Sequence, residues 1–394
     1  MASIDSSRLW NKFFIFCLFN NMFLFIFYFA QTAVLPVYII SDLNGTVAQA
    51  GLAMTLFMVS SIVVRPFSGL IIEKFGKKKT FLVSELIFCL FSFAYLLADN
   101  LSVLLVIRFL HGIWFSILTT VCVPIANDFI PEKRKGEGMG YFIMSINLGL
   151  VLGPLLGLSL IQPLGYTTVA LILATIICLG FAFCLLIPIR EIKKLPEVTE
   201  KKKISLQDFV EKRALPASLM VMLLAFGYSS IMSYISTFAE TKGLLSSAGL
   251  FFVVFAVAMM SIRPFTGRLY DIKGPNIIIY PSIILFIMGL ILLSQIETLT
   301  GLMISAIFIG MGFGSLQPCL QTLAIQRSPR YRIGHTTSTF FTLYDTGIAL
   351  GAVLLGYVVA LYGYTVMYLL CAFIIALSLI FYKFVVDRQN PLQP

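Results

Sequence analysis

Charged residues are scarce in this sequence of 394 residues: Asp, Glu, Lys and Arg make up 12% of it, whereas 59% is hydrophobic. A water-soluble chain this apolar would expose large hydrophobic patches and aggregate. Only two histidines are present, and the seven cysteines form no Cys-x-x-Cys motif and no Cys/His pair. We therefore interpret the cysteines as small core residues and expect neither disulfide bonds nor a metal site.

Two further absences argue against particular classes of function. The sequence has no Gly-x-x-x-x-Gly-Lys-[Ser/Thr] run, the loop that cradles nucleotide phosphates, which argues against ATP-driven work by this chain. An intramembrane enzyme would need clustered His and Asp or a Ser/Lys pair, whereas the histidines and acids here are scattered. We therefore expect neither an enzyme nor a bound cofactor.

One pattern is present twice. Arg-Pro-Phe-Ser-Gly at residues 65–69 is matched by Arg-Pro-Phe-Thr-Gly at residues 263–267, and the matched positions differ by 198, close to half of the 394 residues. A tandem duplication of membrane-spanning halves is typical of secondary transporters, in which one half rocks against the other. The repeat therefore predicts a duplicated membrane transporter.

Apolar segments of the right length support this interpretation, because about 20 apolar residues are needed to cross about 30 Å of hydrocarbon. The predicted spans cover residues 13–39, 48–72, 79–98, 101–125, 138–161, 167–188, 215–238, 247–270, 276–295, 300–324, 336–361 and 365–386. We expect an all-α membrane protein with twelve transmembrane helices in two halves of six.

A basic segment separates the two groups of spans. Residues 189–214 carry eight lysines and arginines among five acids. We predict residues 1–188 as the N-terminal half, residues 189–214 as a cytoplasmic linker and residues 215–394 as the C-terminal half.

The basic residues also predict the orientation. Of the 28 lysines and arginines, Lys242 falls in an outer loop and Arg65, Arg108 and Arg263 fall within spans, which leaves 24 on the cytoplasmic side if the N-terminus is cytoplasmic. We expect a multi-pass protein of the inner or plasma membrane with both termini cytoplasmic and an uncleaved first span. The charge of +10 is thereby explained without nucleic acid.

The loop after the second span carries the first motif. Gly69 and Gly76 enclose Glu73, and lysines follow. Taken alone, this is a tight turn with positive-inside charge. Its spacing resembles the Gly-x-x-x-Asp-[Arg/Lys]-x-Gly-[Arg/Lys]-[Arg/Lys] loop of the major facilitator superfamily, with Glu73 in place of Asp, and residues 267–274 repeat it. The resemblance implies a cytoplasmic latch that holds the outward-facing state. The latch residues it implies are Gly69, Glu73, Gly76, Lys77, Asp128 and Arg134.

A second motif lies inside the fourth span. Arg108 must face the protein interior or a water-filled cavity, because lipid exposure of a charge is costly. Residues 108–112 resemble the Arg-x-x-Gln-Gly motif of the same superfamily, which is associated with proton coupling, with His111 in place of Gln. The alternatives are a structural clamp for Arg108 and a hydrogen-bonded interior side chain for His111.

Glycines form the third motif. Their spacing of four leaves one helix face flat, and the proline bends the helix. The motif resembles the Gly-x-x-x-Gly-Pro-x-x-Gly-Gly pattern of the antiporter branches, although Leu158 replaces the last Gly. The predicted hinge residues are Gly149, Gly153, Pro154, Gly157, Gly347 and Gly351. The resemblance is thus to drug/proton antiporter-like exporters of this superfamily.

Two acids are predicted well inside the bilayer, Glu85 and Asp345. A carboxyl group there can take up and release a proton as its access to water alternates. We predict proton coupling through Asp345, Glu85, Arg108 and His111. The alternative is a neutral acid that is hydrogen-bonded to a neighbouring helix or, for Glu85, which lies a turn or two from the cytoplasmic edge, membership of the inner charge network.

The substrate is harder to predict. Polar residues on the spans that line the cavity in this family are Asn20, Asn21, Gln31, Tyr228, Tyr234, Gln317 and Gln321, and each is alternatively a helix-packing residue. The first span lacks the acid that many exporters of cationic drugs carry there, so the spare charge of Arg108 favours an anionic or zwitterionic substrate.

We therefore expect a monomeric transporter in the lipid bilayer that exports a small organic molecule, such as a drug-like compound or a self-made metallophore, in exchange for protons. The nearest alternative is a proton symporter that imports a nutrient or osmolyte. More distant alternatives are a lipid flippase and a membrane scaffold without transport activity.

Overall fold

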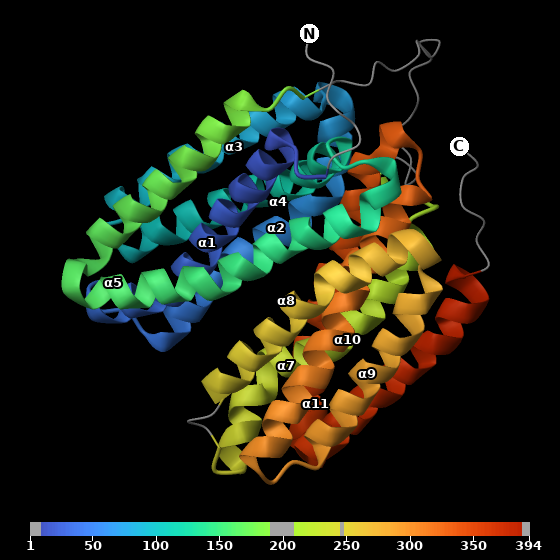
Figure 1. Cartoon of the computed structure of the whole chain (residues 1–394). Coiled ribbons are helices and arrows are strands. Elements are labelled where there is room, and N and C mark those ends of the chain that lie inside the picture. Colours follow the sequence, from blue (N-terminus) through green and yellow to red (C-terminus); the bar gives the residue numbers. More distant parts are fainter. Residues whose placement is uncertain (1–8, 190–208, 245–247, 388–394) are drawn as a thin grey trace. The chain divides into compact units, whose positions relative to one another are not determined.

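The computed structural model describes residues 9–189, 209–244 and 248–387, and the regular secondary structure of these ranges is entirely helical (Figure 1). The first half of the sequence forms α1 (Lys12–Ser41), α2 (Val47–Phe75), α3 (Lys77–Ala94), η1 (Tyr95–Leu97), α4 (Leu101–Asp128), η2 (Glu132–Arg134) and α5 (Lys135–Leu186). The second half forms α7 (Leu215–Thr241), α8 (Ala248–Lys273), α9 (Asn276–Ser294), α10 (Leu299–Gln326), η4 (Arg330–Arg332), α11 (Ile333–Phe381) and η5 (Tyr382–Val386). The predicted all-α class is confirmed.

Glycines divide two very long helices. In α5 the backbone breaks at Gly165 (φ 72°, ψ 165°), and in α11 it breaks at Gly363 (φ 82°, ψ 174°). Only glycine adopts a positive φ of this kind without strain. Eleven helical stretches of the described chain are long and apolar enough to cross a membrane, and the last of them, Arg330–Val386, contains the break at Gly363. Counting its two parts separately confirms the twelve predicted spans.

Helix starts repeat with the same spacing as the motifs. At the start of α4, Asn100 Oδ1 accepts a hydrogen bond from the backbone N–H of Val103 at 3.0 Å. Thr298 Oγ1 does the same for Gly301 at the start of α10, at 3.2 Å. These caps satisfy backbone donors that have no partner within the helix. Since Asn100 and Thr298 are 198 positions apart, the duplication extends to the local signals that start helices.

The chain forms two compact units that do not follow the halves of the sequence strictly. Unit 1 comprises Met1–Pro131, Phe142–Val210 and Arg330–Ser338, and unit 2 comprises Glu132–Tyr141, Glu211–Pro329 and Thr339–Pro394. The start of α11 thus belongs to unit 1, and the start of α5 belongs to unit 2. Most of the predicted linker, residues 190–208, lies outside the described residues, and the division at residues 189–214 stays a prediction.

The fourth helix of each half lies at the centre of its unit. In unit 1, α4 packs against α1, α2 and α3, and in unit 2, α10 packs against α7, α8 and α9 (Figure 1). Side chains on α4 and α10 are buried along almost the whole second part of each helix. This central position explains why a charged residue of α4, Arg108, is only 1% exposed.

Candidate functional site

A carboxyl group is enclosed in the interior of unit 1. Glu85 lies on α3 and is 1% exposed. Its Oε2 accepts a hydrogen bond from the side-chain amide of Asn20 on α1 at 3.4 Å, and the thiol of Cys184 interacts with the same carboxyl group. The second part of α5 makes room for this group, since a Cβ at Gly180 would lie 3.6 Å from Glu85 Oε1 and 2.7 Å from Asn20 Oδ1. Asn20 of α1 and Cys184 of α5 are therefore uncharged partners of Glu85.

Arg108 forms a second buried group further along the same bundle. Its Nε donates to the carbonyl oxygen of Ala53 at 3.3 Å and its Nη1 to the hydroxyl of Tyr95 at 3.4 Å. The guanidinium carbon also lies 4.2 Å from the ring centroid of Phe57. No carboxylate of the described chain forms a salt bridge with Arg108. The buried cation is thus held by neutral acceptors and a π face.

His111 belongs to the same group. Its Nδ1 lies 3.2 Å from the hydroxyl of Tyr95, so this phenol contacts both His111 and Arg108. The imidazole is fully buried, and its centroid is 4.0 Å from that of Phe88. Tyr95 was not predicted as a site residue, and the sequence carries no signal for it apart from its position at the end of the third span.

The acid predicted in the second half lies in a different unit. Asp345 is half-buried on α11, in the part of that helix that belongs to unit 2. Arg263 of the same unit is 1% exposed and donates from Nε to the carbonyl oxygen of Gly314 at 3.1 Å. The predicted coupling residues therefore divide into Glu85, Arg108 and His111 in unit 1 and Asp345 in unit 2.

The predicted latch residues are also divided. In unit 1, Lys77 Nζ forms a salt bridge with Asp128 Oδ2, and Glu73 Oε2 lies 2.6 Å from His335 Nε2. Gly76 has a φ of 82° in the turn that joins α2 to α3. Gly69 allows the start of α11 to approach, because a Cβ there would lie 2.9 Å from the Cα of His335.

Arg134 is placed elsewhere. It belongs to unit 2, where its guanidinium forms two hydrogen bonds with the carboxylate of Glu137, at 2.6 and 2.7 Å. The structure thus pairs Glu73 with His335 and pairs Arg134 with Glu137. Arg134 was grouped with Glu73 and Asp128 because the resemblance implies one latch, and that latch stays a prediction.

Sequence reasoning missed the matching contact of unit 2. Asp271 accepts hydrogen bonds from the backbone N–H groups of Gly136 and Glu137, at 2.7 and 2.9 Å. Asp271 and Glu73 are 198 positions apart, as are His335 and Glu137. The repeat offset, applied to the whole of the first motif and its partners, is the signal that could have found Asp271 and His335.

The predicted hinge glycines lie where helices touch. A Cβ at Gly153 of α5 would lie 2.8 Å from the backbone oxygen of Ile26, and one at Gly149 would lie 2.8 Å from the backbone carbonyl carbon of Phe25. Gly157 continues this face toward Val34, at 2.6 Å from its Cγ2. The α5 helix continues through Pro154. The glycine face of α5 therefore packs directly on α1.

The same relationship recurs in unit 2. Gly347 of α11 approaches the carbonyl oxygen of Met222 on α7, and a Cβ at Gly351 would lie 2.7 Å from the carbonyl oxygen of Phe226. The two glycine pairs, 198 positions apart, thus serve equivalent helix contacts. Whether these contacts act as hinges stays a prediction.

Several predicted cavity residues make contacts within their own unit. Asn21 donates to Ser145 Oγ at 2.9 Å, Tyr234 donates to the carbonyl oxygen of Ala352, and the ring of Tyr228 stacks on another aromatic ring. These contacts join neighbouring helices, as the alternative interpretation of helix packing expects.

Two glutamines behave differently. Gln31 and Gln321 are at most 1% exposed, and neither atom of the Gln321 amide has a hydrogen-bond partner within the described ranges, whereas the side chain of Gln31 interacts with the hydroxyl of Tyr166. Gln317, one turn before Gln321 on α10, is half-buried. An unsatisfied buried amide is costly, so water or a ligand is the expected partner of Gln321.

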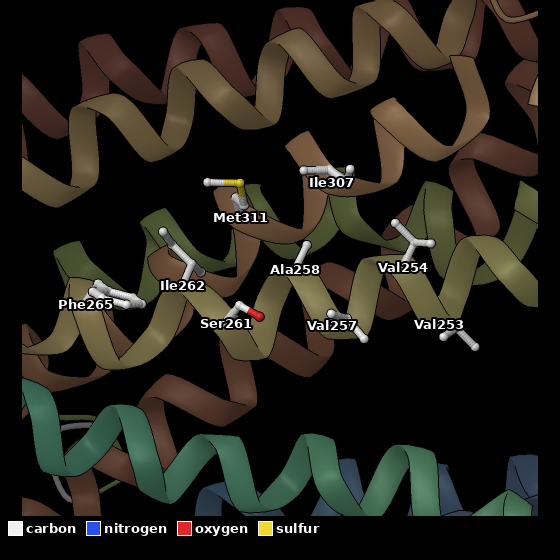
Figure 2. Close-up of a pocket in the computed structure, with 9 residues that line it drawn as sticks. All are labelled: Val253, Val254, Val257, Ala258, Ser261, Ile262, Phe265, Ile307 and Met311. Carbon is white, nitrogen blue, oxygen red and sulfur yellow. The ribbon is translucent and has the colours of Figure 1, made fainter. Parts of the chain in front are cut away.

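An apolar pocket of about 460 Å³ lies between α8 and α10 of unit 2 (Figure 2). Figure 2 shows Ile307 and Met311 of α10 beside side chains of α8. Ser261 supplies the single hydroxyl among its nine lining residues. The pocket therefore lacks the convergent polar groups that would orient a polar ligand.

Comparison with known proteins agrees with the fold. A sequence profile of the Major Facilitator Superfamily matches residues 17–352. The chain is similar to the multidrug resistance protein MdtG of Escherichia coli, with 26% identity over 342 residues that cover 84% of this chain and 83% of that protein.

Two solved structures show the same architecture. The human organic anion transporter MFSD10 matches with a TM-score of 0.78 and 14% identity, over 93% of this chain and 98% of that one. The superfamily transporter FucP matches with a TM-score of 0.79 and 16% identity, over 97% of this chain and 100% of that one. FucP of E. coli is a fucose:proton symporter. At such identities the likeness is one of fold.

Proposed function

The chain belongs to the major facilitator superfamily, and on this premise we propose that it exports a small organic molecule in exchange for protons. The observation that carries the proposal is the enclosure of Glu85, a carboxyl group that is 1% exposed and whose identified partners are the amide of Asn20 and the thiol of Cys184. A carboxyl group in such surroundings can carry a proton across the bilayer interior without moving an unpaired charge.

Alternating access supplies the coupling. A proton that enters from outside neutralises Glu85 or Asp345, and the changed charge of these interior acids favours the return to the inward-facing state. The proton leaves to the cytoplasm, after which the carrier binds its cargo. Each step changes the relative free energy of the two states, which is the requirement for a bound proton to shift a conformational equilibrium.

Two observations support export. The Gly149, Gly153 and Pro154 motif is typical of antiporter branches, and its glycines form a flat helix face through which α5 packs on α1. The similar E. coli protein is named for multidrug resistance. The alternative of proton-coupled uptake has support in the fold that is shared with FucP, a symporter. A lipid flippase or a scaffold without transport activity has no comparable support.

The charge of the interior bears on the substrate. Arg108 is buried and is held by neutral acceptors, whereas the enclosed acid of its unit, Glu85, contacts Asn20. A charge in a low-dielectric interior gains strongly from a counter-charge. An anionic or zwitterionic substrate, whether a drug-like compound or a self-made metallophore, would supply one. The similar fold of a human organic anion transporter is consistent with this substrate class.

The remaining features follow from the sequence. The excess of Lys and Arg on one side supports a location in the inner or plasma membrane with both termini cytoplasmic. The halves would be residues 1–188 and 215–394, joined by a basic cytoplasmic linker, and a single chain would suffice as the functional unit.

The decisive experiment begins with the cargo. Metabolites in the medium of wild-type and deletion cells are compared, and the compound that is lost from the medium of the deletion strain is tested in inside-out vesicles. The proposal expects uptake of this compound into the vesicles when their interior is acidic. Accumulation in right-side-out vesicles with an inward proton gradient would instead establish import and overturn the proposal.

A further inference from the structure

The repeat builds one junction twice but with different chemistry. In unit 2, the carboxylate of Asp271 accepts from the backbone N–H groups of Gly136 and Glu137, at 2.7 and 2.9 Å. In unit 1, at the equivalent position, Glu73 Oε2 lies 2.6 Å from Nε2 of the His335 side chain. A backbone amide does not change its charge with pH, whereas an imidazole does so between about pH 5 and 8.

The backbone geometry of the two junctions is alike. A Cβ at Gly69 would lie 2.9 Å from the Cα of His335, and a Cβ at Gly267 would lie 2.7 Å from the Cα of Glu137. Below these contacts, Ser338 Oγ donates to the carbonyl oxygen of Arg65 at 2.5 Å. The two junctions therefore share this close approach of helices, and the junction of unit 1 includes an imidazole.

The junction of unit 1 is accessible to water at one edge. A cavity of about 90 Å³ is lined by Glu73, His335 and residues from α3, α4 and η4. Besides Glu73 of α2, the charged or titratable groups that face His335 are Lys77 of α3 and Arg330 and Tyr331 of η4. Asp128 of α4 joins them through its salt bridge to Lys77. The side chain of Glu73 is 23% exposed, and that of His335 is 1% exposed. A proton can thus reach a pair that is otherwise packed.

The tautomer of the neutral His335 ring follows from the surroundings of its second nitrogen, Nδ1. Nδ1 is buried and has no hydrogen-bond partner in the described part of the chain. A buried N–H without an acceptor costs more than an unused lone pair, so the neutral ring places its proton on Nε2, where it donates to Glu73. A second proton, on Nδ1, turns the contact with Glu73 into an ion pair, whose attraction opposes the cost of burying that N–H without an acceptor.

We propose that His335 and Glu73 form a proton-sensing junction on the cytoplasmic side, separate from the coupling site, that tightens when the cytoplasm becomes acidic. Because α11 begins in unit 1 and continues in unit 2, any movement that frees the start of α11 from unit 1 must break this contact. The consequence for transport rests on the proposed function: proton antiport brings protons into the cytoplasm, so a junction that tightens with acid slows the carrier before the cytoplasm acidifies further.

The sensing step can be tested without a substrate, because the chain has only two histidines. The full chain, with 13C-labelled histidine, is placed in lipid nanodiscs and its imidazole signals are followed by NMR from pH 5.5 to 8. The His335→Gln variant identifies the His335 signal by its loss. We expect this signal to change with pH and the change to move to lower pH in Glu73→Gln. A signal of His335 that is independent of pH, or that is unaffected by Glu73→Gln, would overturn the proposal.

The regulatory step is tested by transport of the cargo identified from the medium. At a fixed pH difference, the export rate of the wild type should fall about five-fold as the cytoplasmic-side pH decreases from 7.5 to 6. The rate of His335→Gln should stay constant, whereas the control Asp271→Asn should keep the wild-type pH profile. Equal profiles for wild type and His335→Gln would refute the regulatory role. Absence of proton-driven export with an intact NMR response would instead refute the proposed function and leave the sensor standing.

Discussion

The side-chain amide of Asn20 on α1 donates to a carboxyl oxygen of Glu85 on α3 across 3.4 Å, in the interior of unit 1. Gly180, from the second part of α5, lies beside both side chains and leaves them room. An acid is therefore enclosed at a point where three helices of one unit meet. This arrangement separates the proposed proton site from Arg108, because Tyr95, which contacts Arg108, follows Glu85 by ten residues, or about 15 Å of helix.

The contact between α5 and α1 depends on the absence of a side chain at Gly153. Gly153→Ala would place a Cβ 2.8 Å from the backbone of both Ile26 and Ala30, and these atoms cannot rotate away. We expect a loss of about 1–3 kcal/mol in the free energy of unfolding, together with slower transport. Thermal unfolding in detergent measures the first effect.

The matched control is Gly51→Ala. Gly51 is also helical, on α2, but a Cβ there would meet nothing within 4 Å. Its substitution should leave stability unchanged or raise it slightly, because alanine favours a helix more than glycine does. Equal effects of the two substitutions would contradict the assigned helix contact.

The charge of Arg108 can be separated from its hydrogen bonds. Arg108→Lys keeps the charge but loses the fork that reaches Ala53 and Tyr95, whereas Arg108→Gln removes the charge. If the substrate is anionic or zwitterionic, Arg108→Gln should raise its KM at least about ten-fold, and Arg108→Lys should raise it much less.

Tyr95→Phe serves as the comparison for the two Arg108 variants. It removes the hydroxyl that Arg108 and His111 share but leaves the charge. We expect a loss of about 1 kcal/mol in stability and little change in KM. A similar KM in Arg108→Gln and wild type would show that the cation does not contact the cargo.

Asp271 holds the start of α5 through two backbone hydrogen bonds. Asp271→Asn retains one acceptor oxygen and removes the negative charge at the N-terminus of this helix. We expect the free energy of unfolding to fall by about 0.5–2 kcal/mol, which chemical denaturation of the full chain measures. Faster hydrogen exchange should follow at Gly136 and Glu137 and stay unchanged at His335; uniform exchange across the chain would argue against this local role.

The architecture could be predicted from the sequence because the motifs that indicate it recur at a constant offset of 198 residues. The motifs at residues 65–69 and 263–267 fixed the offset, and the same offset relates the caps Asn100 and Thr298 and the breaks Gly165 and Gly363. The apolar spans followed from length and composition alone. The breaks fall in the predicted gaps between spans, at residues 162–166 and 362–364, although the sequence did not show that a single glycine makes each of them.

Contacts between distant residues were harder to predict. The flat faces at Gly149 and Gly153 indicated close packing, but only the structure shows that α1 is the partner of α5. Arg134 pairs with Glu137, three residues away, a partner that the sequence analysis did not name. Which carboxylate an arginine meets depends on how the helix ends pack, and no local pattern records this.

Proton exchange at an enclosed acid is tested by measuring proton flux and cargo flux together. The purified chain is reconstituted into proteoliposomes that contain a pH-sensitive dye, and export of the compound identified from the medium is driven by a pH difference. Glu85→Gln keeps the shape of the side chain and a hydrogen-bonding oxygen for Asn20 but cannot titrate, and Asp345→Asn tests the other predicted acid in the same way.

We predict that wild type moves protons in a fixed ratio to cargo, and that Glu85→Gln or Asp345→Asn abolishes transport driven by the pH difference while exchange of labelled for unlabelled cargo continues. Unchanged coupling in both variants would remove these acids from the mechanism. Cargo export by the wild type without any proton movement would contradict proton antiport.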